Sequence, residues 1–199
     1  MFIFLDTCSL LDSCWVQRGS TPERFDYSRE KEARFWNHEL SSLFGRGQII
    51  LPARNYEELL KFQGREDESL ALRANHILKI LSMLIGNKAI KVVGDANDPF
   101  ADAILLSVAL KFRTREDLLF ITQDRGLACD LFSISQFRSV HSNKKLDVKR
   151  IAKNGALEAF GLNSNGGSKG GFNKNRRVNR EHSSEGAHNI VQTRKWWQD

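Results

Sequence analysis

The chain has 199 residues, of which 41% are hydrophobic and 27% charged, which is ordinary for a globular protein with one buried core. It has no run approaching the roughly 18 apolar residues of a membrane span, and residues 1–5 are too short, and lack the basic flank, for a signal peptide. We therefore expect a cytoplasmic protein without membrane contact. Its three cysteines are odd in number and lack C-x-x-C spacing, which argues against a disulfide framework and a thiolate zinc site.

The net charge of +6 is unevenly distributed along the chain. Residues 163–199 hold seven Lys or Arg and three Asp or Glu, a balance of +4, which leaves 23 basic and 21 acidic residues, or +2, for residues 1–162. A basic segment beside a nearly balanced body favours a polyanionic partner, although basic tails are common and the signal is weak.

Hydrophobic patterning in the first quarter of the chain predicts alternating strands and helices. Residues 1–5 form an apolar strand, followed by a short helical run through Val16. Residues 22–44 carry an apolar stripe that predicts one charged, amphipathic helix. Residues 49–51 predict a short buried strand, after which Pro52 suits the first turn of a further helix.

The same alternation continues through the middle of the chain. Residues 66–86 predict a helix with acids in its first turn, where the helix dipole favours them, and residues 89–93 predict a strand. Asp98 followed by Pro99 is a helix-start signal leading into a helix over residues 101–112.

The last predicted elements complete a sheet with helices on both faces. Residues 118–122 are a continuous apolar strand of the buried type, followed by a short helix, and we expect a last strand from Val140 and a closing helix over 146–160. The β, α alternation implies a three-layer α/β/α fold with a mainly parallel sheet. We divide the chain into a folded domain, 1–162, and a flexible basic tail rich in Gly, Asn and Ser, 163–199, with an apolar C-terminal segment.

Four acids are predicted to converge at one edge of this sheet. Asp6 and Asp124 each follow a strand, and ligands of open α/β sheets bind outside the carboxyl ends of the strands. Glu58 and Asp102 lie in helices that follow strands, so they face the same edge. Four converging carboxylates repel one another unless a divalent cation binds, and hard oxygen ligands suit Mg²⁺ or Mn²⁺.

The segments around these acids resemble, in order, the four acidic motifs of PIN-domain ribonucleases: FIFLDTCSLL, LPARNYEELLKF, DPFADAILLSVALKF and LLFITQDRGLACDL. The resemblance covers residues 1 to about 135 and implies a PIN-like fold. It also implies that Asp6, Glu58, Asp102 and Asp124 are the metal-binding catalytic residues of a Mg²⁺- or Mn²⁺-dependent ribonuclease.

Residues around the acids leave several alternatives open. Cys8 stands where many PIN domains have Asn, two residues after the first Asp, and Ser9 is a potential substitute for that support. Asp98 fits a helix cap better than an outer metal ligand. Periodicity does not separate Glu57 from Glu58, and Glu58 is chosen from the Glu-Leu pairing of the family.

Other polar residues carry weaker signals. Thr122, two residues before Asp124, either orients a carboxylate or is a plain strand residue, and Arg125 either steadies a phosphate or is solvated. None of the five histidines has ligand-like spacing, and His76 is interpreted as a boundary residue of an amphipathic helix.

The resemblance, which is to toxin-type PIN nucleases, implies an endoribonuclease, and because no candidate His or Lys base is present we expect it to hydrolyse RNA phosphodiesters to 5′-phosphate and 3′-hydroxyl ends. Whether it acts as a toxin beside an antitoxin is left open. The alternative is a non-catalytic PIN-fold module that binds RNA or a protein. Trp196 and Trp197 could stack on bases or dock on an antitoxin or another protein partner, and a homodimer is left open.

Overall fold

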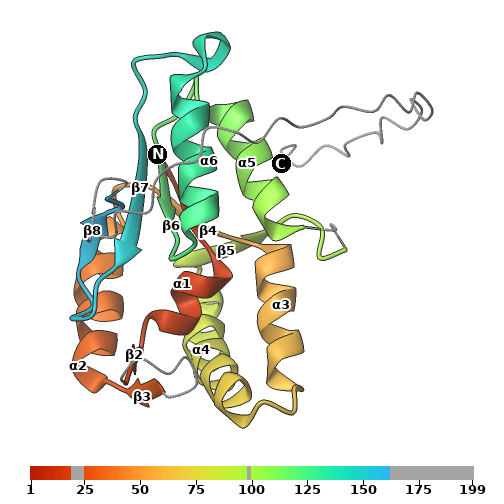
Figure 1. Ribbon diagram of the computed structural model, residues 1–199, viewed down its shortest axis with the longest axis vertical. Helices are drawn as coiled ribbons and strands as arrows, with labels where there is room; N and C mark the ends of the chain where they lie inside the picture. Colours follow the sequence, from red (N-terminus) through yellow and green to blue (C-terminus); the bar gives the residue numbers. More distant parts are fainter. Residues whose placement is uncertain (19–24, 98–99, 162–199) are drawn as a thin grey trace, which may run out of the picture. The chain divides into compact units, whose positions relative to one another are not determined.

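A computed structural model describes residues 1–18, 25–97 and 100–161, and Met1–Phe160 form a compact unit. Within the described residues, the main sheet has six strands in the order β5-β4-β1-β6-β7-β8 (Figure 1). All neighbours are parallel except β7 and β8. The expected α/β/α architecture with a mainly parallel sheet is confirmed. The strands are β1 Phe2–Leu5, β4 Gln48–Pro52, β5 Ile90–Val93, β6 Leu118–Ile121, β7 Leu146–Ile151 and β8 Leu157–Ala159.

Strand β1 lies at the centre of the sheet and pairs on both sides. Its Phe4 is in register with Ile50 of β4 and with Phe120 of β6. Ile3 and Leu5 are fully buried and Phe4 nearly so, as expected for a strand covered on both faces. The continuous apolar run at the start of the chain is therefore explained by its central position.

One face of the sheet packs on α1 (Thr7–Asp12), α3 (Ala53–Gln63) and α4 (Glu68–Gly86). Ile3 and Leu5 of β1 share a core cluster there with Leu59 of α3 and Ile77 of α4, among others. Because side chains alternate along a strand, Phe2 and Phe4 point to the opposite face. Contact of the Phe2 ring with Phe112 places α5 on that second face.

The second face is covered by α5 (Ala101–Phe112) and α6 (Arg125–Gln136), which lie side by side in Figure 1. On this face the rings of Phe4 and Phe120 stack with their centroids 5.1 Å apart. None of the described helices combines the length and the apolar character that crossing a bilayer requires. The expected helix start at Asp98 and Pro99 and the expected tail from residue 163 lie outside the described residues.

The segment between α1 and β4 differs from the single helix predicted over 22–44. Its strands β2 (Trp15–Gln17) and β3 (Phe25–Tyr27) form an antiparallel ribbon in which Trp15 is paired with Tyr27. Helix α2 (Arg29–Glu32) is capped by Ser28, whose hydroxyl accepts a hydrogen bond from the Lys31 amide. The chain then continues as π-helical and 3₁₀ turns to Leu43. The helical run expected through Val16 also ends earlier, at Asp12.

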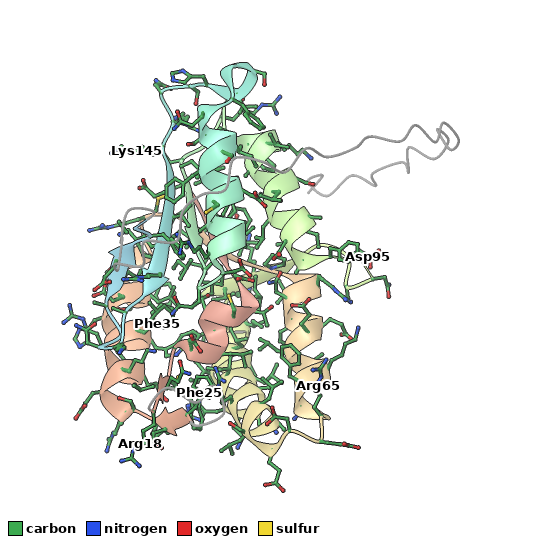
Figure 2. The ribbon with its side chains drawn as sticks, viewed as in Figure 1. Arg18, Phe25, Phe35, Arg65, Asp95 and Lys145 are labelled. Atoms are coloured by element: carbon green, nitrogen blue, oxygen red, sulfur yellow. The ribbon has the colours of Figure 1, made fainter. Side chains whose placement is uncertain are left out.

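The aromatic pair Trp15 and Tyr27, whose ring centroids are 5.7 Å apart, stabilises the ribbon, and the helical stripe later in the segment obscured this signal. The Arg73 guanidinium of α4 stacks over the Phe25 ring, with its central carbon 3.8 Å from the ring centroid. Figure 2 labels Phe25 in the ribbon and Phe35 in the helical part of the same segment. We refer to residues 13–44 below as the insertion.

The predictions for the end of the domain were wrong. The helix expected over 146–160 is instead the hairpin β7–β8, since the burial of Leu146 and Val148 alternates with exposed positions. The turn holds the Asn-Gly sequence typical of tight hairpins, and Gly155 has a φ of +86°. Val140 ends a 3₁₀ turn and starts no strand.

Candidate metal centre

The order of the strands reverses direction at the centre of the sheet. From β1 the chain builds outward to β4 and β5 on one side, then returns to add β6 and β7 on the other. In open α/β sheets such a reversal leaves a crevice at the carboxyl ends of the two central strands. Leu5 and Ile121, the last residues of β1 and β6, are partners in the register, so Asp6 and Asp124 follow at the same edge.

Asp6 is the most buried of the four candidate acids, with 6% of its surface exposed. It occupies the N-cap position of α1, but its side chain makes no capping hydrogen bond. Its carboxylate instead accepts hydrogen bonds from Cys8 Sγ at 2.6 Å, Thr122 Oγ1 at 2.7 Å and Asn55 Nδ2 at 3.1 Å. Burial raises the pKa of Asp6, and the charge of Asp124 adds to the rise, while the hydrogen bonds oppose it.

Thr122 connects the first acid to the last. Its hydroxyl donates to Asp6 and accepts a hydrogen bond from the backbone amide of Asp124 at 2.9 Å. The contacts of Thr122 match the interpretation that its hydroxyl orients a carboxylate, and that carboxylate is the one of Asp6. Asp124 itself caps α6, since its Oδ1 accepts from the Leu127 amide at 2.9 Å. A Cβ at Gly126 would come within 3.1 Å of that oxygen, so glycine there keeps the carboxylate unobstructed.

Glu58 is linked to Asp6 through two polar side chains. Thr7 Oγ1 donates to Glu58 Oε2 at 2.8 Å, and the buried amide of Asn55 donates to both Thr7 and Asp6. Arg54 Nε lies 3.8 Å from the other Glu58 oxygen, too far for a hydrogen bond. No contact of this kind is made by Glu57 with any described residue, so the structure places Glu58 at the edge.

Asp102 lies in the first turn of α5 and is largely exposed. Its carboxylate accepts no hydrogen bond from a described residue. Burial raises its pKa, and the charges of Asp6, Asp124 and Glu58 raise it further. All four acids therefore share one electrostatic environment, which we call the carboxylate edge.

The carboxylate edge is not a closed set of ligands. Among the described residues, the group of three or more potential ligands whose atoms lie within 4.8 Å of one another is Cys14, Glu32 and His76, and it contains none of the four acids. All four acids offer carboxylate oxygens, and those of Asp102 accept no hydrogen bond from a described residue, so they are free to bind an ion. The Oδ1 of Asn55 is also buried without a partner among the described residues. An all-oxygen donor set of this kind fits Mg²⁺ or Mn²⁺.

Support for Asp6 comes from residues that sequence reasoning treated differently. Cys8 donates to the carboxylate, whereas Ser9 does not support it because the Ser9 hydroxyl donates to the backbone oxygens of Asp6 and Ile121. Asn55 was missed altogether. Asn55 lies four residues before Leu59 and therefore on the same buried face of α3, and this position is the sequence signal that could have identified it.

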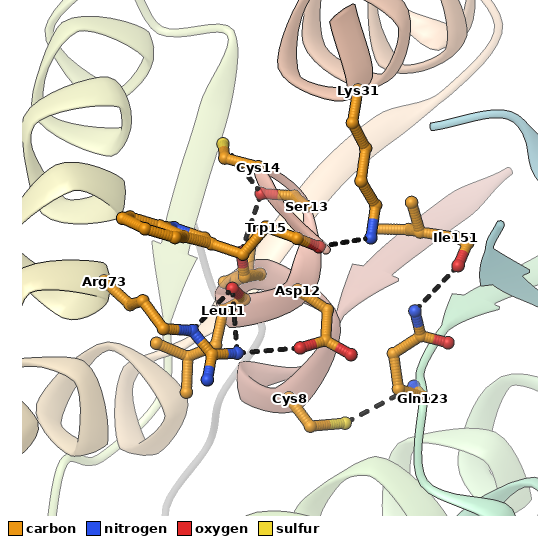
Figure 3. A network of polar contacts seen from close by, with 11 residues as sticks. Cys8, Leu11, Asp12, Ser13, Cys14, Trp15, Lys31, Arg73, Gln123 and Ile151 are labelled. Carbon is orange, nitrogen blue, oxygen red and sulfur yellow. Dashed lines mark hydrogen bonds and ion pairs between the residues drawn. The ribbon is translucent and has the colours of Figure 1, made fainter. Parts of the chain in front are cut away.

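The Cys14, Glu32 and His76 group lies in the insertion and α4, at the other end of α1. Sequence reasoning missed it because its members are far apart in the chain and show no ligand spacing. Figure 3 shows the polar contacts around this end of α1, where Arg73 donates to Asp12 at 2.7 Å and the buried amine of Lys31 donates to the Trp15 carbonyl at 2.8 Å. The described residues thus include a thiol-containing group that could hold a metal ion, which the cysteine spacing argued against.

Compared with protein families and with curated proteins, the chain has no match to either. Inference about its function therefore starts from the geometry of these two groups.

Proposed function

We propose that this protein is a Mg²⁺- or Mn²⁺-dependent endoribonuclease of the PIN type, with its active site at the carboxylate edge. The observation that carries the proposal is the meeting of Asp6, Glu58, Asp102 and Asp124 at the reversal of strand order, joined by hydrogen bonds and shared charge. The same four acids stand in the motifs that resemble the PIN family. Fold and motif order therefore lead to one set of residues.

The division of roles follows from the contacts. Asp6, fixed by three donors, is the rigid central ligand, and Asp124 and Asp102 are the more exposed ligands beside the substrate. Glu58, held by Thr7, completes the set or orients a water. A bound Mg²⁺ or Mn²⁺ would supply a hydroxide nucleophile near neutral pH and neutralise charge that develops at the phosphate.

The chain itself offers no evident general base at this edge. None of the described histidines is hydrogen-bonded to any of the four acids, and the Cys8 thiol is unsuited to act as one because burial and the Asp6 charge raise its pKa well above the ordinary value. We therefore assign the attack on phosphorus to the metal-bound hydroxide and not to the RNA 2′-hydroxyl. It is expected to leave 5′-phosphate and 3′-hydroxyl ends.

Two features near the edge suit a phosphate backbone. Helices α3, α5 and α6 begin at this end of the sheet, so the positive ends of their dipoles face the crevice. A groove of about 520 Å³ adjoins Asp124 through Gln123 and is lined by residues of the β7–β8 hairpin, including Arg150 and Lys153. Arg150 is paired with Glu158 across the hairpin, whereas Lys153 is exposed and forms no ion pair with a described residue, so its amine is available to a phosphate.

The experiment is incubation of the purified full chain with end-labelled RNA and with DNA of the same sequence, in Mg²⁺, Mn²⁺ or EDTA. We expect internal cleavage of RNA that needs the metal and gives products that a 5′-phosphate-dependent exonuclease degrades. Cleavage that persists in EDTA, or products with 2′,3′-cyclic phosphate ends, would contradict the mechanism. Binding of RNA without cleavage under every condition would support the non-catalytic module.

A further inference from the structure

We propose that Cys14, Glu32 and His76 form a second metal site, selective for Zn²⁺ or a similar borderline cation, that ties the insertion to helix α4. The ligand atoms of these residues lie within 4.8 Å of one another. Each comes from a different element: Cys14 precedes β2, Glu32 ends α2 and His76 lies in the middle of α4. The site does not depend on the proposed nuclease activity.

The distances allow one ion to bind all three residues. Ligand atoms around a tetrahedral Zn²⁺ lie about 3.5 Å apart, given bond lengths of about 2.0–2.3 Å. The observed separations reach that spacing with small side-chain rotations. Glu32 Oε2 and His76 Nε2 are now 2.6 Å apart in a hydrogen bond, so binding would replace that bond with two bonds to the ion. Water would fill the fourth position.

The donor set discriminates between metals. Sulfur and imidazole nitrogen suit Zn²⁺ and disfavour Mg²⁺, which selects oxygen ligands. A thiolate and a carboxylate also balance the two positive charges of Zn²⁺, so the loaded site would be neutral, which burial of Cys14 requires. Burial raises the pKa of the free Cys14 thiol to about 12, and a bound ion would displace its proton.

The surroundings orient each ligand as outer residues do in metal sites. The buried indole of Trp36 donates from Nε1 to Cys14 Sγ at 3.3 Å, a contact that stabilises a thiolate. The hydroxyl of the exposed Tyr27 is hydrogen-bonded to Glu32. The rings of Trp15 and Tyr27 both meet the His76 ring edge-on, with centroids 6.4 and 5.3 Å away, and so limit its rotation.

A metal at this position would crosslink a part of the fold that has few strand contacts. The β2–β3 ribbon has three residues in each strand and pairs with no strand of the main sheet, and isolated two-stranded ribbons are marginally stable. Cys14 and Glu32 flank the ribbon on either side, and His76 anchors both to α4. Loading the site should therefore stabilise the insertion.

The test uses the full chain, freed of metal by chelation and titrated with Co²⁺ as a spectroscopic probe for Zn²⁺. We expect a thiolate-to-cobalt charge-transfer band that saturates at one equivalent and is lost when Zn²⁺ is added. Cys14→Ser should abolish the band, while Cys129→Ser, a matched change in α6, should retain it. His76→Gln and Glu32→Gln should weaken Co²⁺ binding by at least about a hundredfold, since loss of outer partners alone costs about 10–100-fold. Glu30→Gln, on the exposed side of α2, is the control for Glu32.

A second measurement protects the test against a Cys14 variant that fails to fold. Zn²⁺ should raise the melting temperature of the wild-type protein and of Glu30→Gln but not that of Glu32→Gln. The proposal is overturned if the wild-type protein gives no thiolate band, if the band survives in Cys14→Ser, or if Zn²⁺ stabilises Glu32→Gln as much as wild type. None of these results depends on RNA cleavage.

Discussion

The two proposed metal sites lie at the two ends of helix α1 and differ in the chemistry of their ligands. At its start, Asp6 belongs to an all-oxygen group built on the ends of parallel strands, with Asp102 and Asp124 exposed to solvent. Beyond its end, Cys14 belongs to a sulfur, nitrogen and oxygen group built on the insertion, with the sulfur buried. The difference shows that sheet topology alone assembles the first group, whereas the second requires an added segment to fold against α4.

The largest effect expected is loss of cleavage in Asp6→Asn. Removing the central carboxylate should lower kcat/KM by at least about a thousandfold, equivalent to about 4 kcal/mol of transition-state stabilisation. The same variant should keep the cobalt–thiolate band of the Cys14 group, since the two groups share no residue. Asp147→Asn, an exposed change on β7, is the matched control. Full activity in Asp6→Asn would contradict the proposed active site.

Thr122 should act by positioning Asp6 and Asp124. Thr122→Val removes the hydrogen bonds of the hydroxyl to Asp6, to the Asp124 amide and to Cys8 at nearly constant volume, and it should lower kcat by about 10–100-fold, as expected for partners that orient metal ligands. Thr122→Ser should recover most of the rate. KM for RNA should change little in either variant. A loss of equal size in the Ser variant would point to packing of the methyl group in place of hydrogen bonding.

Asp124 has a structural role that can be separated from its proposed catalytic one. Asn is as good an N-cap as Asp, so Asp124→Asn should abolish cleavage without loss of stability, whereas Asp124→Ala should also lower the free energy of unfolding by about 1 kcal/mol. Urea unfolding of both variants without metal measures the difference. RNA cleavage by the Asp124→Asn variant would show that Asp124 acts as a helix cap and not as a catalytic residue.

Repulsion at the carboxylate edge should appear as a pH dependence of stability without metal. Because burial first, and then the charge of Asp124, raise the pKa of Asp6 above 3.8, the folded state holds its proton more tightly than the unfolded chain. Stability should therefore fall as pH rises from about 4 through the raised pKa. In EDTA, Asp6→Asn should unfold at higher urea than wild type at pH 7, and the gap should narrow toward pH 4. If the difference in urea midpoint between Asp6→Asn and wild type widens toward pH 4, the pKa of Asp6 is not raised in the folded state.

The smallest effect is expected at the hairpin groove beside the edge. Lys153→Ala should weaken RNA binding slightly and reduce the slope of log affinity against log salt by about 0.7, the loss of one phosphate contact on a single strand. The rate on saturating RNA should stay the same, since Lys153 lies outside the carboxylate edge. An unchanged slope would exclude this groove as an RNA path.

The position of Asp6 and Asp124 at one edge could be predicted from sequence because each follows a strand with a strong apolar signal. Asp6 and Asp124 end continuous buried runs, and parallel strands bring such ends together. Asn55 could not be predicted as readily because a single amide in a helix has no periodic signal of its own. The Cys14 group was beyond sequence reasoning because its contacts join α2 to α4 through tertiary packing.

The errors in secondary structure have a similar origin. The ribbon before Ser28 and the hairpin β7–β8 are short, and their identity depends on which partner strand they meet. In the hairpin, Asn154 and Gly155 carried the local turn signal, and Gly155 is required by a further contact: a Cβ there would lie 2.4 Å from the Lys31 carbonyl oxygen. The close approach between the hairpin and α2 explains why this turn accepts no side chain.

The large sequence separation of the Asp6 contacts determines when, during synthesis, the carboxylate edge can assemble. The hydrogen-bond partners of Asp6, Asn55 and Thr122, are synthesised 49 and 116 positions after it. At about 5–20 residues per second, the ribosome needs roughly 6–23 s to produce the second partner after the first acid. During that interval the nascent chain cannot assemble the carboxylate edge. A nuclease built in this way would remain inactive beside the messenger RNA that encodes it until nearly the whole domain had left the ribosome.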